Sequence, residues 1–188
     1  MTILVAGLVL VLGIHLVPAL PPARAALATT WGENRYKGAF SLISALGLVL
    51  IIAGYALSDD RTRVFAPLPA ARAVAPYAMV VSFILFAAAN MRGHLRHGLR
   101  HPMLLGLLIW SAVHLLANGD RTGTVLFGAF ALYAIVDLVS AIARGEVKSF
   151  EPMVKHDIIA VLGGTAVALA VMTFHRLLFG VAVVPFGV

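Results

Sequence analysis

Three ionisable side chains interrupt apolar runs that would otherwise suit the interior of a lipid bilayer. His15, His114 and Asp137 each lie in a different run of the 188-residue chain. An ionisable group in hydrocarbon is costly, so each one requires an explanation. Neutral imidazole is the only strong metal ligand inside these runs, and two imidazoles from different helices could ligate a haem iron from opposite faces. The alternative is a structural histidine that is hydrogen-bonded to a neighbouring helix.

Asp137 is open to two roles. It could accept the spare ring proton of a ligating histidine and so set the tautomer, or it could pair with a buried donor. His15 lies five residues before the end of its run and Asp137 seven residues before Arg144, which is about 7–8 Å and about 10 Å of helix. The two are therefore expected at similar depth. His114 follows Pro102 by twelve residues, about 18 Å into its own helix.

The densest polar stretch covers residues 92–101. On a helix it would show two adjacent stripes, one of arginines and one of histidines: Arg92, Arg96, Arg100 and His94, His97, His101. A metal site is disfavoured, because no carboxylate accompanies the histidines and three guanidinium groups would repel a cation. An interfacial helix on anionic headgroups, or a cradle for a ligand's carboxylates, fits the stretch better.

Pro102 ends this stretch and makes a new helix start. The residue before a proline is pushed toward extended geometry, so we expect the next helix to begin at Met103. Its free amide groups, together with Arg100 and His101, would form a corner at the membrane surface that attracts a haem propionate or a phosphate. A capped re-entry turn without a ligand is the alternative.

The composition indicates a membrane protein. Hydrophobic residues make up 61% of the chain and charged residues 12%, against about 45–50% and about 25% in soluble domains. The absence of cysteine excludes disulfides, iron–sulfur clusters, thiolate ligation and covalent c-type haem, so any haem must be held by histidine or methionine. The net charge of +6 comes from Lys and Arg scattered among short loops, which favours anionic lipid over nucleic acid as a partner.

Six apolar runs predict an all-α, polytopic bundle of about six transmembrane helices in one domain, residues 1–188. The runs cover residues 3–20, 39–57, 74–91, 103–117, 125–143 and 158–174. The first is expected to be retained and not cleaved as a signal peptide, because no basic segment precedes it. Residues 175–188 could continue the last span or lie in the interface. Gly47, Gly54 and the pair Gly163-Gly164 predict close helix contacts.

The distribution of positive charge predicts the orientation. Nine Lys and Arg follow the first, third and fifth runs, and five lie on the other side. The positive-inside rule then puts loops 21–38, 92–102 and 144–156 in the cytoplasm, with both termini outside.

Three segments together resemble the NnrU family. They are residues 100–120, which contain Arg100-His101-Pro102, Gly106, Trp110, Ser111 and His114, residues 13–18 around His15, and residues 36–42. The resemblance runs from about residue 8 to residue 145. It implies a bacterial inner-membrane protein associated with denitrification and linked to nitrite and nitric oxide reductase function. A relative of the family, the ζ-carotene isomerase, binds b-type haem and isomerises a cis double bond without net redox change.

The resemblance also implies site residues. The positions of the isomerase's candidate haem ligands match His15 and His114 here. Three residues before the second histidine the isomerase carries a cysteine, whereas this chain has Ser111. A ligand exchange based on a thiolate is thereby excluded, while haem binding is unaffected. We expect haem b with His15 and His114 as axial ligands, Arg100 and His101 near the cofactor, and Asp137 and Ser111 behind the ligands.

Three functions remain open: a haem-binding accessory or sensor protein of nitrogen-oxide metabolism, a haem isomerase of a polyene, and a haem-free membrane protein. A more distant resemblance is to membrane methyltransferases that bind S-adenosylmethionine, but their C-terminal motif has only a loose echo at residues 144–151. The expected partners are membrane lipid, nitric oxide or a hydrophobic polyene, and a second copy of the chain.

Overall fold

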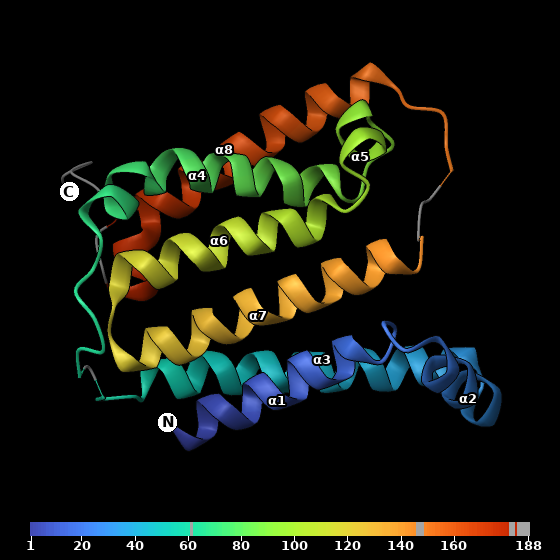
Figure 1. The fold of residues 1–188 in the computed structure, drawn as a ribbon, viewed down its shortest axis with the longest axis horizontal. Helices are drawn as coiled ribbons and strands as arrows, with labels where there is room; N and C mark the ends of the chain where they lie inside the picture. The colour runs from blue at the N-terminus through green and yellow to red at the C-terminus, as the bar shows by residue number, and fades with distance from the viewer. Residues whose placement is uncertain (61, 146–148, 181–182, 184–188) are drawn as a thin grey trace.

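The structure is a computed structural model and describes residues 1–60, 62–145, 149–180 and 183. In these residues it forms eight α-helices and no named strand, which confirms the predicted all-α class (Figure 1). The helices are α1 (Thr2–Leu16), α2 (Pro21–Trp31), α3 (Glu33–Ala56), α4 (Pro69–Ala88), α5 (His94–Leu99), α6 (Pro102–Asn118), α7 (Arg121–Ala143) and α8 (Val154–Phe179).

Six of the helices are arranged as a row. In order they are α3, α1, α7, α6, α4 and α8, and each packs mainly on its neighbours in that row (Figure 1). The contact between α1 and α7 is much the smallest, so α1 and α3 form one pair and the other four helices form a second group. Only 17–22% of the residues in the apolar window of each long helix are buried inside the protein. Lipid is the medium suited to cover such surfaces.

The number of spans is lower than the six expected. By length and composition, four helices can cross a membrane, α3, α4, α7 and α8, and a fifth span results if α1 and α2 count as one broken helix bent by 91°. Alone, α1 has 15 residues and α6 has 17, about 22 Å and 26 Å of helix against roughly 30 Å of hydrocarbon. The first helix stops at Leu16, not at residue 20, because Pro18 and then Pro21 and Pro22 interrupt it.

Glycines set how closely the helices approach each other. A Cβ built on Gly47 would come within 3.0 Å of the Gly7 carbonyl oxygen, and Gly54 lies directly against the backbone of Leu4. Gly164 of α8 lies against the backbone of Ile84 in α4, whereas nothing lies within 4 Å of a Cβ on Gly163. The predicted close contacts are therefore confirmed at Gly47, Gly54 and Gly164, and the prediction is wrong for Gly163.

The positively charged loops gather at one end of the row. That end carries α2, α5, the start of α3 and the start of α8, and it adjoins the end of α7 (Figure 1). The segment predicted as the loop 21–38 contains α2, so it is partly helical. Lys148 and Arg61, which were counted on opposite sides of the membrane, lie outside the described residues. The side of the membrane on which this end lies stays a prediction.

Candidate functional site

Both intramembrane histidines hold the same ring tautomer. Nδ1 of His15 donates a hydrogen bond of 2.8 Å to the carbonyl of Val11, and Nδ1 of His114 donates one of 2.8 Å to the carbonyl of Trp110. A carbonyl oxygen only accepts, so in the neutral ring the proton is on Nδ1 and the lone pair is on Nε2. Neither Nε2 has a hydrogen-bond partner among the described residues. Each histidine is thus tied to its own helix and presents Nε2 as a metal ligand would.

Aromatic rings from two other helices contact His15. Its ring centroid lies 4.9 Å from that of Phe40 on α3 and 6.5 Å from that of Tyr133 on α7, the latter edge-on at 86°. The Tyr133 hydroxyl donates to Asp137 Oδ2 at 3.0 Å. Tyr133 therefore contacts both the His15 ring and the Asp137 carboxylate.

Asp137 pairs with Tyr133 and Arg144, and its predicted role behind a haem ligand stays a prediction. Besides Tyr133, it faces Arg144, whose Nη2 lies 3.8 Å from Asp137 Oδ1. Arg144 also donates to the carbonyl of Ala19 at 2.8 Å and to the hydroxyl of Ser140. The side chains of the pair are only 17% and 19% exposed, so this network closes the α1–α7 contact at the charged end of the row.

His114 lies in an aromatic cluster at the opposite end of α6 from Pro102. Its ring stacks on Phe127 of α7 with centroids 4.8 Å apart, and it lies tilted at 42° against Trp110 with centroids 5.1 Å apart. Trp110 in turn contacts Phe130 edge-on at 5.7 Å. Ser111 is fully buried, and its hydroxyl donates to backbone carbonyls one turn earlier in α6. Ser111 therefore packs and bonds within α6 and adds no ionisable group.

The structure does not bring His15 and His114 together. Their contacts on α7 are Tyr133 and Phe127, six residues and about 9 Å apart along the helix. In addition, α7 lies between α1 and α6 in the row (Figure 1). Joint ligation of one iron stays a prediction, and it would need α1 to shift along α7. Ligation by one histidine needs no such shift.

A third histidine, His175, was not among the residues predicted for the site. Ala168 and Met172 of α8 form a buried cluster against which Trp110 and Val113 of α6 pack, and His175 follows on the same face one turn later. The expected span ended at residue 174, whereas α8 continues to Phe179 and so carries His175 inside it. The spacing i, i+4, i+7 from Ala168 was the available signal.

The remaining candidates, Arg100 and His101, lie at the other end of α6 from His114. The predicted double stripe is wrong, because α5 spans only His94–Leu99 and its helix ends at Arg100, which has a φ of 61°. His101 is the N-cap of α6, and α6 begins at Pro102, one residue earlier than expected. The role of these two residues near a cofactor stays a prediction. Among the described residues no group of three or more His, Asp or Glu could hold a metal ion.

Comparison with known proteins supplies the family. No curated protein and no solved structure matches the chain. The echo of a methyltransferase motif at 144–151 lies partly outside the described residues, at positions 146–148. A family model described as NnrU protein matches residues 3–183, which extends beyond both ends of the resemblance seen in the sequence. Since the match covers nearly the whole chain, the protein belongs to the NnrU family.

Proposed function

We propose that this chain is a haem b-binding membrane protein with an accessory or sensor role in denitrification, and that His114 is an axial ligand of the haem. The observation that supports this most is the arrangement of the buried imidazole, with Nδ1 held by the Trp110 carbonyl and Nε2 without a hydrogen bond among the described residues. Haem-ligating histidines use this arrangement, since the second hydrogen bond fixes the tautomer and makes the ligand more basic.

The residues around His114 suit a porphyrin. Trp110 and Phe127 supply flat apolar surfaces at 5.1 Å and 4.8 Å from the imidazole, and their packing holds the ring in one orientation. The short apolar helix α6 and the apolar faces of its neighbours would exclude water from the cofactor. When bound, a b-type haem supplies an iron that can take a diatomic ligand such as nitric oxide and can exchange one electron.

The accessory or sensor role is favoured over the polyene isomerase by Ser111. A buried hydroxyl that is hydrogen-bonded to its own helix occupies the position where the related isomerase offers a thiolate. One ligand from α6 would also leave a position on the iron for a gas. His15 and His175 are the two residues that could fill this position instead, each after a shift of its own helix.

The location follows from the same reasoning. We propose the bacterial inner membrane, with the end that carries α2 and α5 in the cytoplasm, as the family association and the excess of positive charge support. The family is associated with nitrite and nitric oxide reductase function. The protein would therefore act where these reductases act.

Purified protein tests haem binding directly. A reduced-minus-oxidised absorption spectrum should show b-type bands, with about one haem per chain, and adding nitric oxide to the reduced form should shift the Soret band. Protein that is folded, purified from cells supplied with haem, and free of these bands would contradict the proposal. For the physiological role, a deletion strain grown on nitrate without oxygen should accumulate nitrite or nitric oxide, and the wild-type gene should reverse this.

A further inference from the structure

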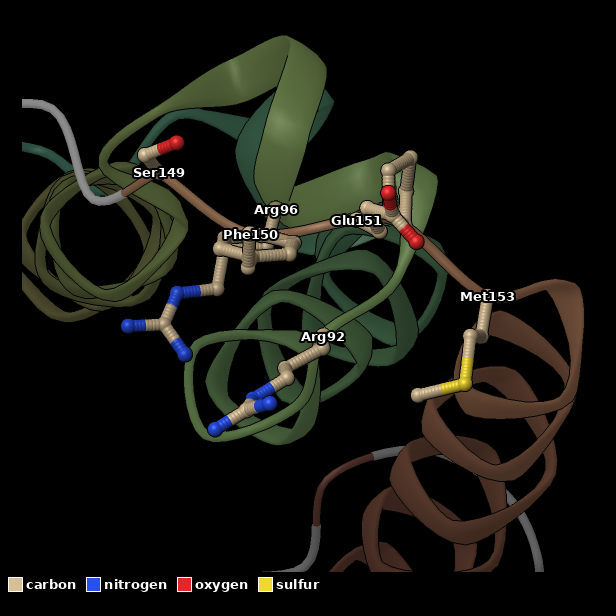
Figure 2. Close-up of a pocket in the computed structure, with 7 residues that line it drawn as sticks. Arg92, Arg96, Ser149, Phe150, Glu151 and Met153 are labelled. Atoms are coloured by element: carbon tan, nitrogen blue, oxygen red, sulfur yellow. The ribbon is translucent and has the colours of Figure 1, made fainter.

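Two arginines line a hollow at the charged end of the row. It has a volume of about 610 Å³ and lies between the segment that joins α4 to α5 and the segment 149–153 that precedes α8. Arg92 comes from the first segment and Arg96 from α5, which follows it, whereas Phe150, Glu151 and Met153 come from the second segment (Figure 2). The two segments are far apart in the chain, so the hollow is formed only when the helices are assembled.

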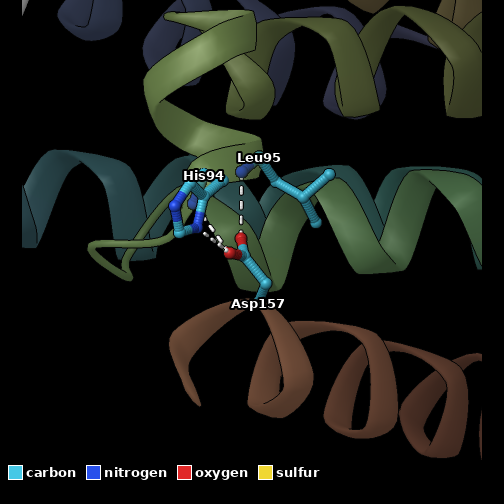
Figure 3. A network of polar contacts seen from close by, with 3 residues as sticks. All are labelled: His94, Leu95 and Asp157. Carbon is cyan, nitrogen blue, oxygen red and sulfur yellow. Dashed lines mark hydrogen bonds and ion pairs between the residues drawn. The ribbon is translucent and has the colours of Figure 1, made fainter. Parts of the chain in front are cut away.

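Backbone and side-chain bonds hold the two sides of the hollow in place. The amide of Met153 donates to the carbonyl of Arg92 at 2.9 Å. Asp157, in the first turn of α8, accepts hydrogen bonds from the amides of His94 at 2.8 Å and Leu95 at 2.9 Å, and from Nδ1 of His94 at 2.8 Å (Figure 3). The start of α5 is therefore fixed to α8, and the positions of the arginine backbones are set before any ligand binds.

The arginines carry positive charge that the described protein does not neutralise. Arg96 stacks on Phe150, with its Cζ 5.4 Å from the ring centroid, and donates one long bond of 3.4 Å to the Met91 carbonyl. Neither Arg92 nor Arg96 forms an ion pair within the described residues. Figure 2 shows both guanidinium groups on one side of the hollow, with the Glu151 carboxylate directed away from them.

The position of the hollow in the fold indicates which kind of anionic ligand could reach the two arginines. The ends of α4 and α8 adjoin it, and both helices are long and apolar enough to span a membrane. Apolar side chains around it face outward, with Met153 37%, Val154 62% and Ile158 54% exposed. A ligand bound here would thus have its charged group on the arginines and an apolar part along α8.

We propose that this hollow binds the phosphate group of a membrane phospholipid. Two guanidinium groups can donate several hydrogen bonds to phosphate oxygens, and such bonds to charged groups are the strong ones. The acyl chains would lie on the exposed apolar face of α8 beside Met153 and Ile158. This binding is independent of the haem proposed for His114, which lies at the other end of α6.

The test uses the detergent-solubilised full chain and thermal unfolding. Adding phosphatidylglycerol should raise the unfolding temperature of the wild type. In the double variant Arg92→Ala/Arg96→Ala the lipid concentration that gives half of this shift should rise about tenfold or more, because the charge-assisted hydrogen bonds of both guanidinium groups are lost. Arg35→Ala is the matched control, since it removes an exposed arginine of the same end of the row, and it should behave as the wild type.

Further measurements keep the result interpretable. Inorganic phosphate at the same concentration should give no shift; a shift equal to that of the lipid would overturn the lipid as the ligand. Equal responses of the wild type and the double variant would overturn the site itself. If the alanine variant does not fold, Arg92→Lys/Arg96→Lys keeps the charges and loses the forked geometry, and it should need more lipid than the wild type. Unchanged lipid dependence in the lysine variant would count against recognition by the two guanidinium groups.

Discussion

Replacing each of two adjacent glycines by alanine tests the packing of α8 against α4. A Cβ on Gly164 would lie 2.5 Å from the Cα and 2.7 Å from the amide nitrogen of Ile84, and 2.8 Å from the Phe83 carbonyl oxygen. These are backbone atoms, so the clash is relieved only if the two helices separate. A Cβ on Gly163 meets nothing within 4 Å.

The size of the effect follows from the two environments. Extra volume in a packed contact costs about 1–3 kcal/mol. The free energy of unfolding of Gly164→Ala should therefore be lower than that of the wild type by this amount. Gly163→Ala adds no contact and exchanges a poor helix former for a good one, so it should be neutral or up to about 1 kcal/mol more stable. We therefore expect the free energies of unfolding of the two variants to differ by about 1–4 kcal/mol, although the substituted positions are adjacent in the chain.

Unfolding by sodium dodecyl sulfate in mixed micelles, followed by tryptophan fluorescence, measures this difference. Trp110 is a suitable reporter because it packs against the buried cluster that includes Ala168 and Met172 of α8. The midpoint of Gly164→Ala should fall to lower detergent fractions than that of the wild type, and that of Gly163→Ala should not. Equal midpoints for the two variants would refute the close contact between α4 and α8.

Three further predictions concern the rest of the chain. Reporter tags inserted in α2 and α5 should lie on the same side of the membrane, and tags in opposite compartments would contradict the arrangement of the row. Asp137→Ala leaves the mostly buried Arg144 without its carboxylate and should cost about 1–3 kcal/mol in the same unfolding assay; an unchanged midpoint would show that the pair adds nothing. A hydrogen bond from Thr62, and then the nearby Arg121 guanidinium, lower the pKa of Asp60 below 3.8. Since the folded pKa is the lower one, this stabilisation is present above pH 3.8 and is lost as the pH falls through the folded pKa, so Asp60→Asn should flatten the acid side of a stability-versus-pH curve.

The apolar runs were sufficient to predict the long helices, but they did not predict α2 and α5. The four helices that pass as spans each overlap an expected apolar run. The helix α2 was missed because Pro21–Trp31 is much less apolar, although two prolines at a helix start followed by alanines are a helix signal. The stripe on residues 92–101 assumed one continuous helix, and Arg100 ends it after six residues with a left-handed backbone. The start of α5 is fixed by a tertiary contact, the Asp157 bonds to the amides of His94 and Leu95, which the local sequence does not reveal.

The candidate site was predictable in its residues and not in its geometry. The cost of burial selected His15, His114 and Asp137. Helix spacing put the two histidines about 10 Å apart in depth, and their contact residues on α7, Tyr133 and Phe127, are six residues or about 9 Å of helix apart. The tautomers depend on which ring nitrogen meets a backbone carbonyl, and the sequence does not show this. The partners of Asp137 are Tyr133, four residues before it, and Arg144, seven residues after it, so helical spacing could have indicated them. The spacing of His175 from Ala168 and Met172 was visible in the sequence, but its place next to α6 was not, because the packing of α8 on Trp110 and Val113 links residues far apart in the chain.

The haem content of histidine variants tests the central claim most directly. The wild type, His15→Ala, His114→Ala and His175→Ala are purified alike, with His97→Ala of α5 as a control outside the spans, and the ratio of haem to polypeptide and the Soret band are recorded. We expect His114→Ala to retain less than about a tenth of the wild-type haem, because its only ligand from α6 is lost, and the His97→Ala control to retain all of it. Loss of haem in His15→Ala or His175→Ala as well would identify a second ligand. Full haem content with an unaltered Soret band in His114→Ala would contradict the account.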